Sequence, residues 1–245
     1  MYGVELWGFK ERAEIEKIQV RYIKWTLGLD IRTPGYLVLE ESKREKLRVK
    51  AGIRAWKFEE GVRKDVGRKI VKECVKEKEA NKEQTRTGKE REEYLKRNGL
   101  SQAEVDELRR EGREVTERIR RRDKEVQQQR QYTKIEQSKY NIRYKYIRTI
   151  GLPEYLSKEG RSQKLIAQAR CGNLENWNKY WEEEEGRRCD LCGDRFGNLE
   201  HLTRDCKETD RDIRMEDVVS GRQDRKIVEW LEKLEKKRKE KRESG

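Results

Sequence analysis

The chain has 245 residues, of which only 32% are hydrophobic and 45% are charged. This composition argues against a large compact core and is typical of long solvated helices, since Glu, Lys and Arg dominate and only 2 prolines occur. The excess of 62 Lys and Arg over 49 Asp and Glu gives a formal net charge of +13, so we expect the surface to attract polyanions, RNA or DNA first. The alternative is that the charge only solvates helix surfaces.

No apolar stretch approaches the ~20 residues needed to cross a bilayer, and the N-terminus lacks the pattern of a signal peptide. We therefore expect an intracellular protein, in the cytoplasm or the nucleus, without a membrane partner. The 5 cysteines are an odd number, and three of them lie with the only histidine in one short segment, which argues against a disulfide framework.

Residues 1–65 predict a helical hairpin. Apolar residues spaced by three and four should form a core-facing stripe on its first helix, and these are Ile15, Ile18, Tyr22, Trp25 and Leu29. Thr33 and Pro34 fit an N-cap and a first helical position, so a second helix should run from Tyr36 to the low 60s. Its aromatic residues, like those of the stripe, are expected to pack rather than to stack on bases.

Apolar residues thin out over 66–100, which predicts a charged helix or a linker. Ser101 and Glu104 then form a capping-box pattern that opens a long basic helix over 101–150, with a heptad pattern too weak for a strong coiled coil. Eight basic residues in this helix form the best local footprint for a polyanion. They are Arg109, Arg110, Arg113, Arg118, Arg120, Arg121, Arg122 and Lys124.

Tyrosines interleaved with basic residues follow this footprint, at Tyr132, Tyr140, Tyr144 and Tyr146. Such a mixture can stack on bases while it contacts phosphates. The alternative is that the helix packs onto a core through Ile135, Ile142, Tyr146 and Ile150. Gly151 and Pro153 should end the helix.

A module over 151–215 should contain a short helix over 162–171 and the cysteine cluster. The remaining residues, 216–245, predict a short amphipathic helix marked by Ile227, Leu231 and Leu234. We expect it to dissolve into the basic run 236–242, which is either a nuclear import signal or a solvated end.

The strongest chemical signal is a set of three cysteines and the only histidine within eighteen residues: Cys189, Cys192, His201 and Cys206. Soft sulfur ligands and a closed count of four favour one structural zinc ion without an open catalytic position. Asn198 should cap a short helix that carries His201, with Cys206 past its end. The alternative is a chance spacing of buried thiols.

An apolar cluster is expected beneath the metal, formed by Leu191, Phe196, Leu199 and Leu202. The folded metal module should present four arginines on one surface, namely Arg187, Arg188, Arg195 and Arg204. The other two thiols, Cys74 and Cys171, lack such company and are expected to be inert and partly buried.

Three segments carry a family resemblance: MYGVELWG, IEKIQVRYIKWTLGLDIRTPGYLVLEE and ARCGNLENWNKYWEEEEGRRCDLCGDRFGNLEHLTRDC. The whole chain resembles the C-terminal portion of insect non-LTR (LINE-like) retrotransposon polyproteins, downstream of the reverse transcriptase polymerase. The segments resemble, in order, the stretch after the palm, the thumb-like helical region and the terminal CCHC zinc-binding segment. The resemblance implies that the four ligands hold zinc and that the region grips template RNA or target DNA.

Two departures limit what the resemblance implies. The gap between Cys192 and His201 is longer than in a retroviral nucleocapsid knuckle, so base readout by that mechanism is not implied. No two aspartates are adjacent anywhere in the chain, so the paired carboxylates that hold two metals for phosphoryl transfer are missing. We therefore expect that the chain is not an enzyme and has no small-molecule substrate.

The sequence thus predicts a mainly α-helical, extended assembly with long basic helices and a small C-terminal zinc-stabilised module. The leading hypothesis is a zinc-dependent, non-catalytic RNA- or DNA-binding fragment of a retrotransposon protein. The alternative is a helical, coiled-coil-like interaction scaffold with a structural zinc. Nothing in the sequence supports an oligomer.

Overall fold

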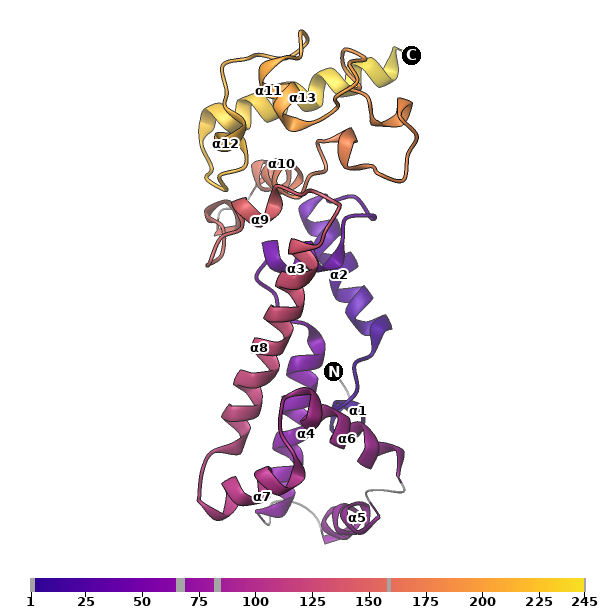
Figure 1. Cartoon of the computed structure of the whole chain (residues 1–245), viewed down its shortest axis with the longest axis vertical. Helices are drawn as coiled ribbons and strands as arrows, with labels where there is room; N and C mark the ends of the chain where they lie inside the picture. Colours follow the sequence, from indigo (N-terminus) through magenta and orange to yellow (C-terminus); the bar gives the residue numbers. More distant parts are fainter. Residues whose placement is uncertain (1–2, 65–68, 82–84, 158–159, 245) are drawn as a thin grey trace. The chain divides into compact units, whose positions relative to one another are not determined.

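The structure is a computed structural model that describes residues 3–64, 69–81, 85–157 and 160–244. These ranges contain thirteen α-helices, three short 3-10 helices and no β-strand, so the mainly α-helical class is confirmed (Figure 1). Residues up to Gln19 join Glu45–Arg130 in unit 1, and Val20–Arg44 join the residues from Gln131 onward in unit 2. Of the three changes of unit, the first and the last fall inside helices, where the sequence offers no break, and the one after Arg44 falls in a turn.

Unit 1 is built from five whole helices and parts of two others. They are α1 (Val4–Trp7), the start of α2 (Ala13–Leu27), α4 (Leu47–Arg63), α5 (Lys69–Ala80), α6 (Arg86–Arg97), α7 (Gln102–Arg110) and most of α8 (Val115–Glu136). Its core centres on Trp56, Tyr94 and Ile119, all with no exposed surface. The described residues of the range 66–100 form two helices, α5 and α6. Tyr94 of α6 is part of this core.

The prediction of a single helix over 101–150 is wrong. The capping box of Ser101 and Glu104 is confirmed at the start of α7, but α7 ends at Arg110 and Gly112 turns the chain with a φ of +66°. The next helix, α8, runs only to Glu136. Its basic surface also hides an acid, because Asp123 is fully buried and pairs with Arg48 of α4.

The second helix of the expected hairpin is interrupted. Instead of one helix there are α3 (Gly35–Glu41) and α4, separated by a turn in which Lys43 has a φ of +49°. The carboxylate of Glu16 accepts the amides of Leu47 and Arg48 and so satisfies the first turn of α4. Thr33 is not the N-cap of α3, because Pro34 holds that position and the Thr33 hydroxyl hydrogen-bonds Asn173.

The apolar stripe expected to face the core on α2 is mostly on the surface. Trp25 is 73% exposed, and Ile18 and Tyr22 are exposed to a similar degree. In the unit 2 part of α2, Val20, Ile23 and Leu27 pack on the core instead. The helix carries two apolar faces at helical spacing, and the partner that decides between them is remote in sequence.

Unit 2 surrounds a core of apolar side chains that also encloses an ion pair between Glu41 and Arg170. Its elements after α8 are α9 (Tyr144–Ile147), η1 (Glu154–Ser157), α10 (Arg161–Arg170), η2 (Asn176–Asn178), η3 (Glu185–Arg187), α11 (Leu199–Arg204), α12 (Met215–Val218) and α13 (Arg225–Glu243). The Glu41 carboxylate accepts a hydrogen bond from the Arg170 guanidinium at 2.6 Å. It also accepts hydrogen bonds from the hydroxyls of Tyr144 and Tyr155, at 2.8 and 2.7 Å. Burial raises the pKa of both tyrosines.

These contacts correct the expected roles of the interleaved tyrosines. Tyr140 and Tyr144 are buried and do not form a stacking surface, whereas Tyr146 is exposed. Of the residues in the packing alternative only Ile135 is buried, since Ile142 and Ile150 are exposed like Tyr146. The helix that ends there is α9, so Gly151 and Pro153 end no long helix.

The last helix is longer than expected. The basic run 236–242 does not dissolve into a tail but continues α13 as far as Glu243. The two remaining cysteines also differ from expectation, because Cys171 is fully buried and Cys74 is exposed. Across the described ranges, no helix combines the length and apolar character that a membrane crossing requires.

Candidate metal centre

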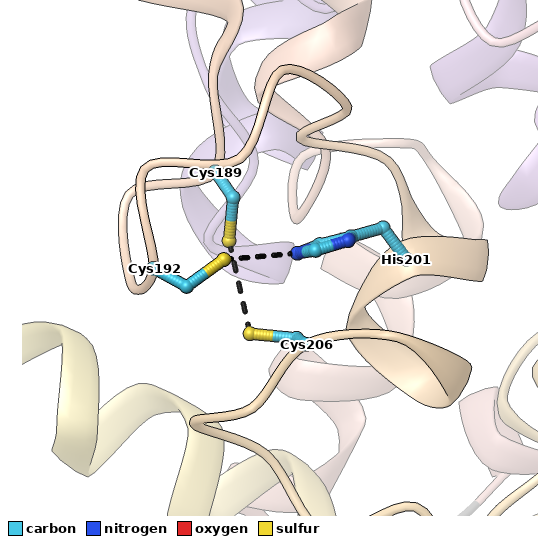
Figure 2. Close-up of side chains that lie close together, drawn as sticks. All are labelled: Cys189, Cys192, His201 and Cys206. Atoms are coloured by element: carbon cyan, nitrogen blue, oxygen red, sulfur yellow. Dashed lines mark hydrogen bonds between the residues drawn. The ribbon is translucent and has the colours of Figure 1, made fainter.

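Four side chains of unit 2 lie close together and could hold a metal ion. The sulfurs of Cys189, Cys192 and Cys206 and the ring of His201 point towards one another (Figure 2). The Sγ atoms of Cys189 and Cys206 are 3.9 Å apart, and Sγ of Cys192 is 3.2 Å from Nε2 of His201. All four donor atoms lie within 4.8 Å of one another. The predicted ligand set is therefore brought together.

The spacing of these donors fits a single metal ion. Metal–sulfur bonds of about 2.3 Å and metal–nitrogen bonds of about 2.0 Å place neighbouring donors of a tetrahedron roughly 3.5 to 3.8 Å apart. The observed 3.2 and 3.9 Å bracket this range. Three thiols and one imidazole complete a four-coordinate set without help from water, so the arrangement is suited to structural binding rather than to an open catalytic site.

The first two ligands lie on a tight turn. The amide of Cys189 donates to the carbonyl of Asp194 at 2.8 Å, and the amide of Gly193 donates back to Cys189 at 2.9 Å. Gly193 has a φ of +79°, a conformation that favours glycine. Gly197 is needed for a different reason, since a Cβ there would lie 2.6 Å from the carbonyl oxygen of Arg187.

The other two ligands are positioned by α11, as predicted. The Asn198 side chain caps this helix by accepting the amide of His201 at 2.8 Å. The chain leaves the helix at Asp205, and the amide of Cys206 donates to the carbonyl of His201 at 2.8 Å. This bond brings the Cys206 sulfur back to the imidazole.

The protein environment alone does not favour the charged form of the Cys189 thiol. Cys189 and Cys206 are buried, and burial raises the pKa of Cys189 to about 12 although the amides of Leu191 and Cys192 oppose the shift. A thiol must lose its proton to bind a metal. A divalent cation bound at this centre would supply the charge that stabilises the thiolates.

The apolar support of the centre agrees with expectation except at one position. Leu191, Leu199 and Leu202 are buried beside the ligands. Phe196 is half exposed and packs instead against Trp177, with 5.8 Å between ring centroids. Phe196 therefore belongs to a surface pair rather than to the cluster beneath the metal.

The last helix, α13, contacts the turn that carries Cys189 and Cys192. The sequence did not predict this contact. Arg238 of α13 pairs with Asp190 at 3.0 Å, and Lys241 donates to the carbonyl of Leu191. Asp190 and Leu191 are the two residues between Cys189 and Cys192. The spacing of Arg238 and Lys241 by one helical turn was a signal available in the sequence, although it did not name the partner.

The four arginines of this module have different surroundings. The guanidinium of Arg187 lies 4.2 Å from the centroid of the Trp177 ring, and that of Arg195 lies 5.8 Å from the Phe196 ring. Arg195 also pairs with Glu184 at 3.0 Å, and Arg204 pairs with Glu200 at 3.1 Å. Arg188 is exposed.

The eight basic residues of the other predicted footprint all lie in unit 1, and most have an acidic neighbour within 4 Å. Arg109 pairs with Glu60 and Lys124 with Glu45, which joins them to α4 and to the turn before it. Local pairs engage Arg113, Arg120, Arg121 and Arg122. Among the described residues only Arg110 and Arg118 of the eight have no ion pair. The free positive charge is thus smaller than the sequence count indicates.

Comparison of the chain with protein-family models, with curated proteins and with solved structures finds no match.

Proposed function

We propose that the chain is a zinc-dependent, non-catalytic RNA- or DNA-binding fragment of a retrotransposon reverse transcriptase polyprotein. The observation that carries the proposal is a four-donor metal centre whose module presents arginines against exposed aromatic rings. Zinc is the metal we assign, because three sulfurs and one imidazole in a closed set suit a borderline-soft ion with tetrahedral coordination.

The support for nucleic acid is the pairing of ring faces with guanidinium groups. Trp177 and Phe196 are partly exposed and carry Arg187 and Arg195 beside them. Aromatic rings stack on unpaired bases and guanidinium groups bind phosphate, which together give affinity without a strict sequence requirement. The net charge of +13 adds long-range attraction for a polyanion.

The assignment to a retroelement rests on the three sequence segments given above. A non-catalytic role is proposed because no adjacent aspartates are present to hold a pair of catalytic metals. Under this proposal the chain contributes grip on RNA or DNA, and the chemistry belongs to the polymerase region of the longer protein.

A second candidate function, an interaction scaffold with a structural zinc, is favoured by the surface of α2. Tyr22 and Trp25 are exposed side by side, with 6.0 Å between ring centroids. Exposed large apolar groups commonly mark protein-binding surfaces. In this case the charge of the chain would serve only solubility.

A salt titration of nucleic-acid binding separates the two functions. If about five basic residues reach phosphates, log affinity against log salt should have a slope of roughly −3 to −5. Replacing Arg118, Arg120, Arg121 and Arg122 with Gln should weaken binding to all sequences alike and flatten the slope. Removing zinc should weaken binding further, because the arginines near the metal would lose their folded support. Weak binding at low salt that neither change affects would favour the scaffold.

A further inference from the structure

A cavity of about 510 Å³ lies in unit 2, and none of the four candidate metal ligands lines it. It is lined by the turn at 28–30, by α10 and the residues after it, and by the last turns of α13. Leu29, Leu165 and Leu231 form an apolar floor and are themselves nearly inaccessible to solvent. Its volume falls within the about 300–1,000 Å³ typical of sites for small organic groups.

One wall of the cavity is cationic. Arg238, Lys239 and Arg242 of α13 line it, and the spacing of 238, 239 and 242 places them on one side of the helix. Arg238 is already engaged by Asp190. In the part of the chain that the structure describes, Lys239 and Arg242 have no ion pair, and both are exposed.

The two acids at the cavity offset these charges only in part, because Glu235 is already paired whereas Asp30 keeps its negative charge. Glu235 pairs with Arg161 at 2.5 Å, and the Asp30 carboxylate accepts the amide of Arg32 at 2.6 Å. Lys239 and Arg242 therefore outnumber the one carboxylate of the lining that has no ion pair among the described residues, Asp30, and they lie beside an apolar floor and the amide side chain of Gln168. An apolar surface next to unpaired cations complements a ligand with a flat ring at one end and a phosphate at the other.

We infer that this cavity receives one nucleotide of a single-stranded nucleic acid, with the base on the leucine floor and the phosphate at Lys239 and Arg242. The inference rests on the proposed function and adds a site to it. A base in a duplex is stacked and paired, and extracting it costs a few kcal/mol. The site therefore selects single strands over duplexes.

The test uses the full chain with zinc bound and a fluorescently labelled single-stranded oligouridine as the probe. The variant Lys239→Gln with Arg242→Gln removes the two free cations. The matched control, Lys226→Gln with Lys236→Gln, removes the same charge from exposed positions of α13 that do not line the cavity. Zinc content and thermal unfolding of both variants confirm that the fold is kept.

We expect the cavity variant to bind about tenfold more weakly near 0.1 M salt, and its salt slope to be smaller by about 1.4, as two lost phosphate contacts require. The control should lose much less. A duplex of the same sequence should respond equally to both variants. If wild type binds and the two variants bind single strands equally well, the inference is wrong while the proposed function stands. If wild type binds neither strand form, the proposed function itself fails.

Photo-crosslinking supplies a second measurement, whose result does not depend on charge alone. An oligonucleotide carrying 4-thiouridine should attach to peptides from 161–174 or 225–243 in the wild type and the control. Competition separates the chemical sources of the ligand. Inorganic phosphate or a free mononucleotide that abolishes the crosslink at micromolar concentration would identify the cavity as a small-molecule site and overturn its assignment to a strand.

Discussion

Arg238 of α13 pairs with Asp190, which lies between the two cysteines of the first metal-binding turn, and the Nε–Oδ2 distance is 3.0 Å. The same guanidinium donates to the carbonyl of Leu174 at 2.8 Å. The Arg238 side chain is only 12% exposed, so water does not readily replace these bonds. The last helix therefore supports the turn that carries Cys189 and Cys192.

Arg238→Gln should lower the free energy of unfolding by about 1–2 kcal/mol, because it leaves a partly buried carboxylate and a carbonyl without their donor. Urea unfolding of the zinc-bound protein measures this loss. Asp190→Asn combined with Arg238→Gln should cost less than the sum of the single changes. Lys236→Gln, an exposed charge on the same helix, serves as the control, and a loss equal to that of Arg238→Gln would contradict the role given to Arg238.

Cys206→Ser should remove most of the bound zinc and unfold the region around 187–210, because three ligands cannot close the site. Metal analysis of the purified protein should find one equivalent in the wild type and in Cys74→Ser, whose thiol is exposed and outside the centre. A full equivalent of zinc in Cys206→Ser would mean that the ligand set is different.

The metal centre was predictable because its information is local. The four ligands, the Asn198 cap and the glycine of the turn lie within eighteen residues, and each follows from the chemistry of its residue type. The capping box at Ser101 is local in the same sense. Such features depend on spacing alone.

The features that the sequence did not predict depend instead on contacts between residues that are far apart in the chain. The sequence does not determine the interior face of α2, because Ile18 and Ile23 both lie on apolar faces and only packing against distant residues selects one. The sequence likewise gives no local signal for the role of Glu41, since its partner Arg170 lies 129 residues away. The burial of Asp123 depends on Arg48, 75 residues distant. A charged composition predicts solvated helices on average, but it does not reveal which few charges are enclosed.

Glu41→Gln should destabilise the protein by about 3–5 kcal/mol, because it leaves the fully buried Arg170 guanidinium without its counter-charge. The two tyrosine hydroxyls that donate to Glu41 would lose a charged acceptor as well. Chemical denaturation should show a lower midpoint. Glu229→Gln breaks an exposed pair with Arg225 and should change stability by less than about 0.5 kcal/mol, so similar losses in both variants would contradict this account.

Glu175 should give unit 2 a component of stability that decreases as pH rises. Burial raises the pKa of Glu175 to about 7, although Arg143 and the amide of Leu199 oppose the shift. In the unfolded chain the carboxyl titrates near 4.5. Between these two values the folded state holds a proton that the unfolded state has lost, so the free energy of unfolding falls as pH increases.

Glu175→Gln keeps an acceptor for the Leu199 amide and removes the titration. The stability of wild type relative to this variant should therefore fall by about 2 kcal/mol between roughly pH 5.5 and roughly pH 8. Deprotonation of the metal-binding thiols acts in the opposite direction, but it is common to both proteins and cancels in the difference. Urea unfolding of both proteins at the two pH values measures it. A difference that is constant with pH would show that Glu175 is charged in the folded protein throughout this range.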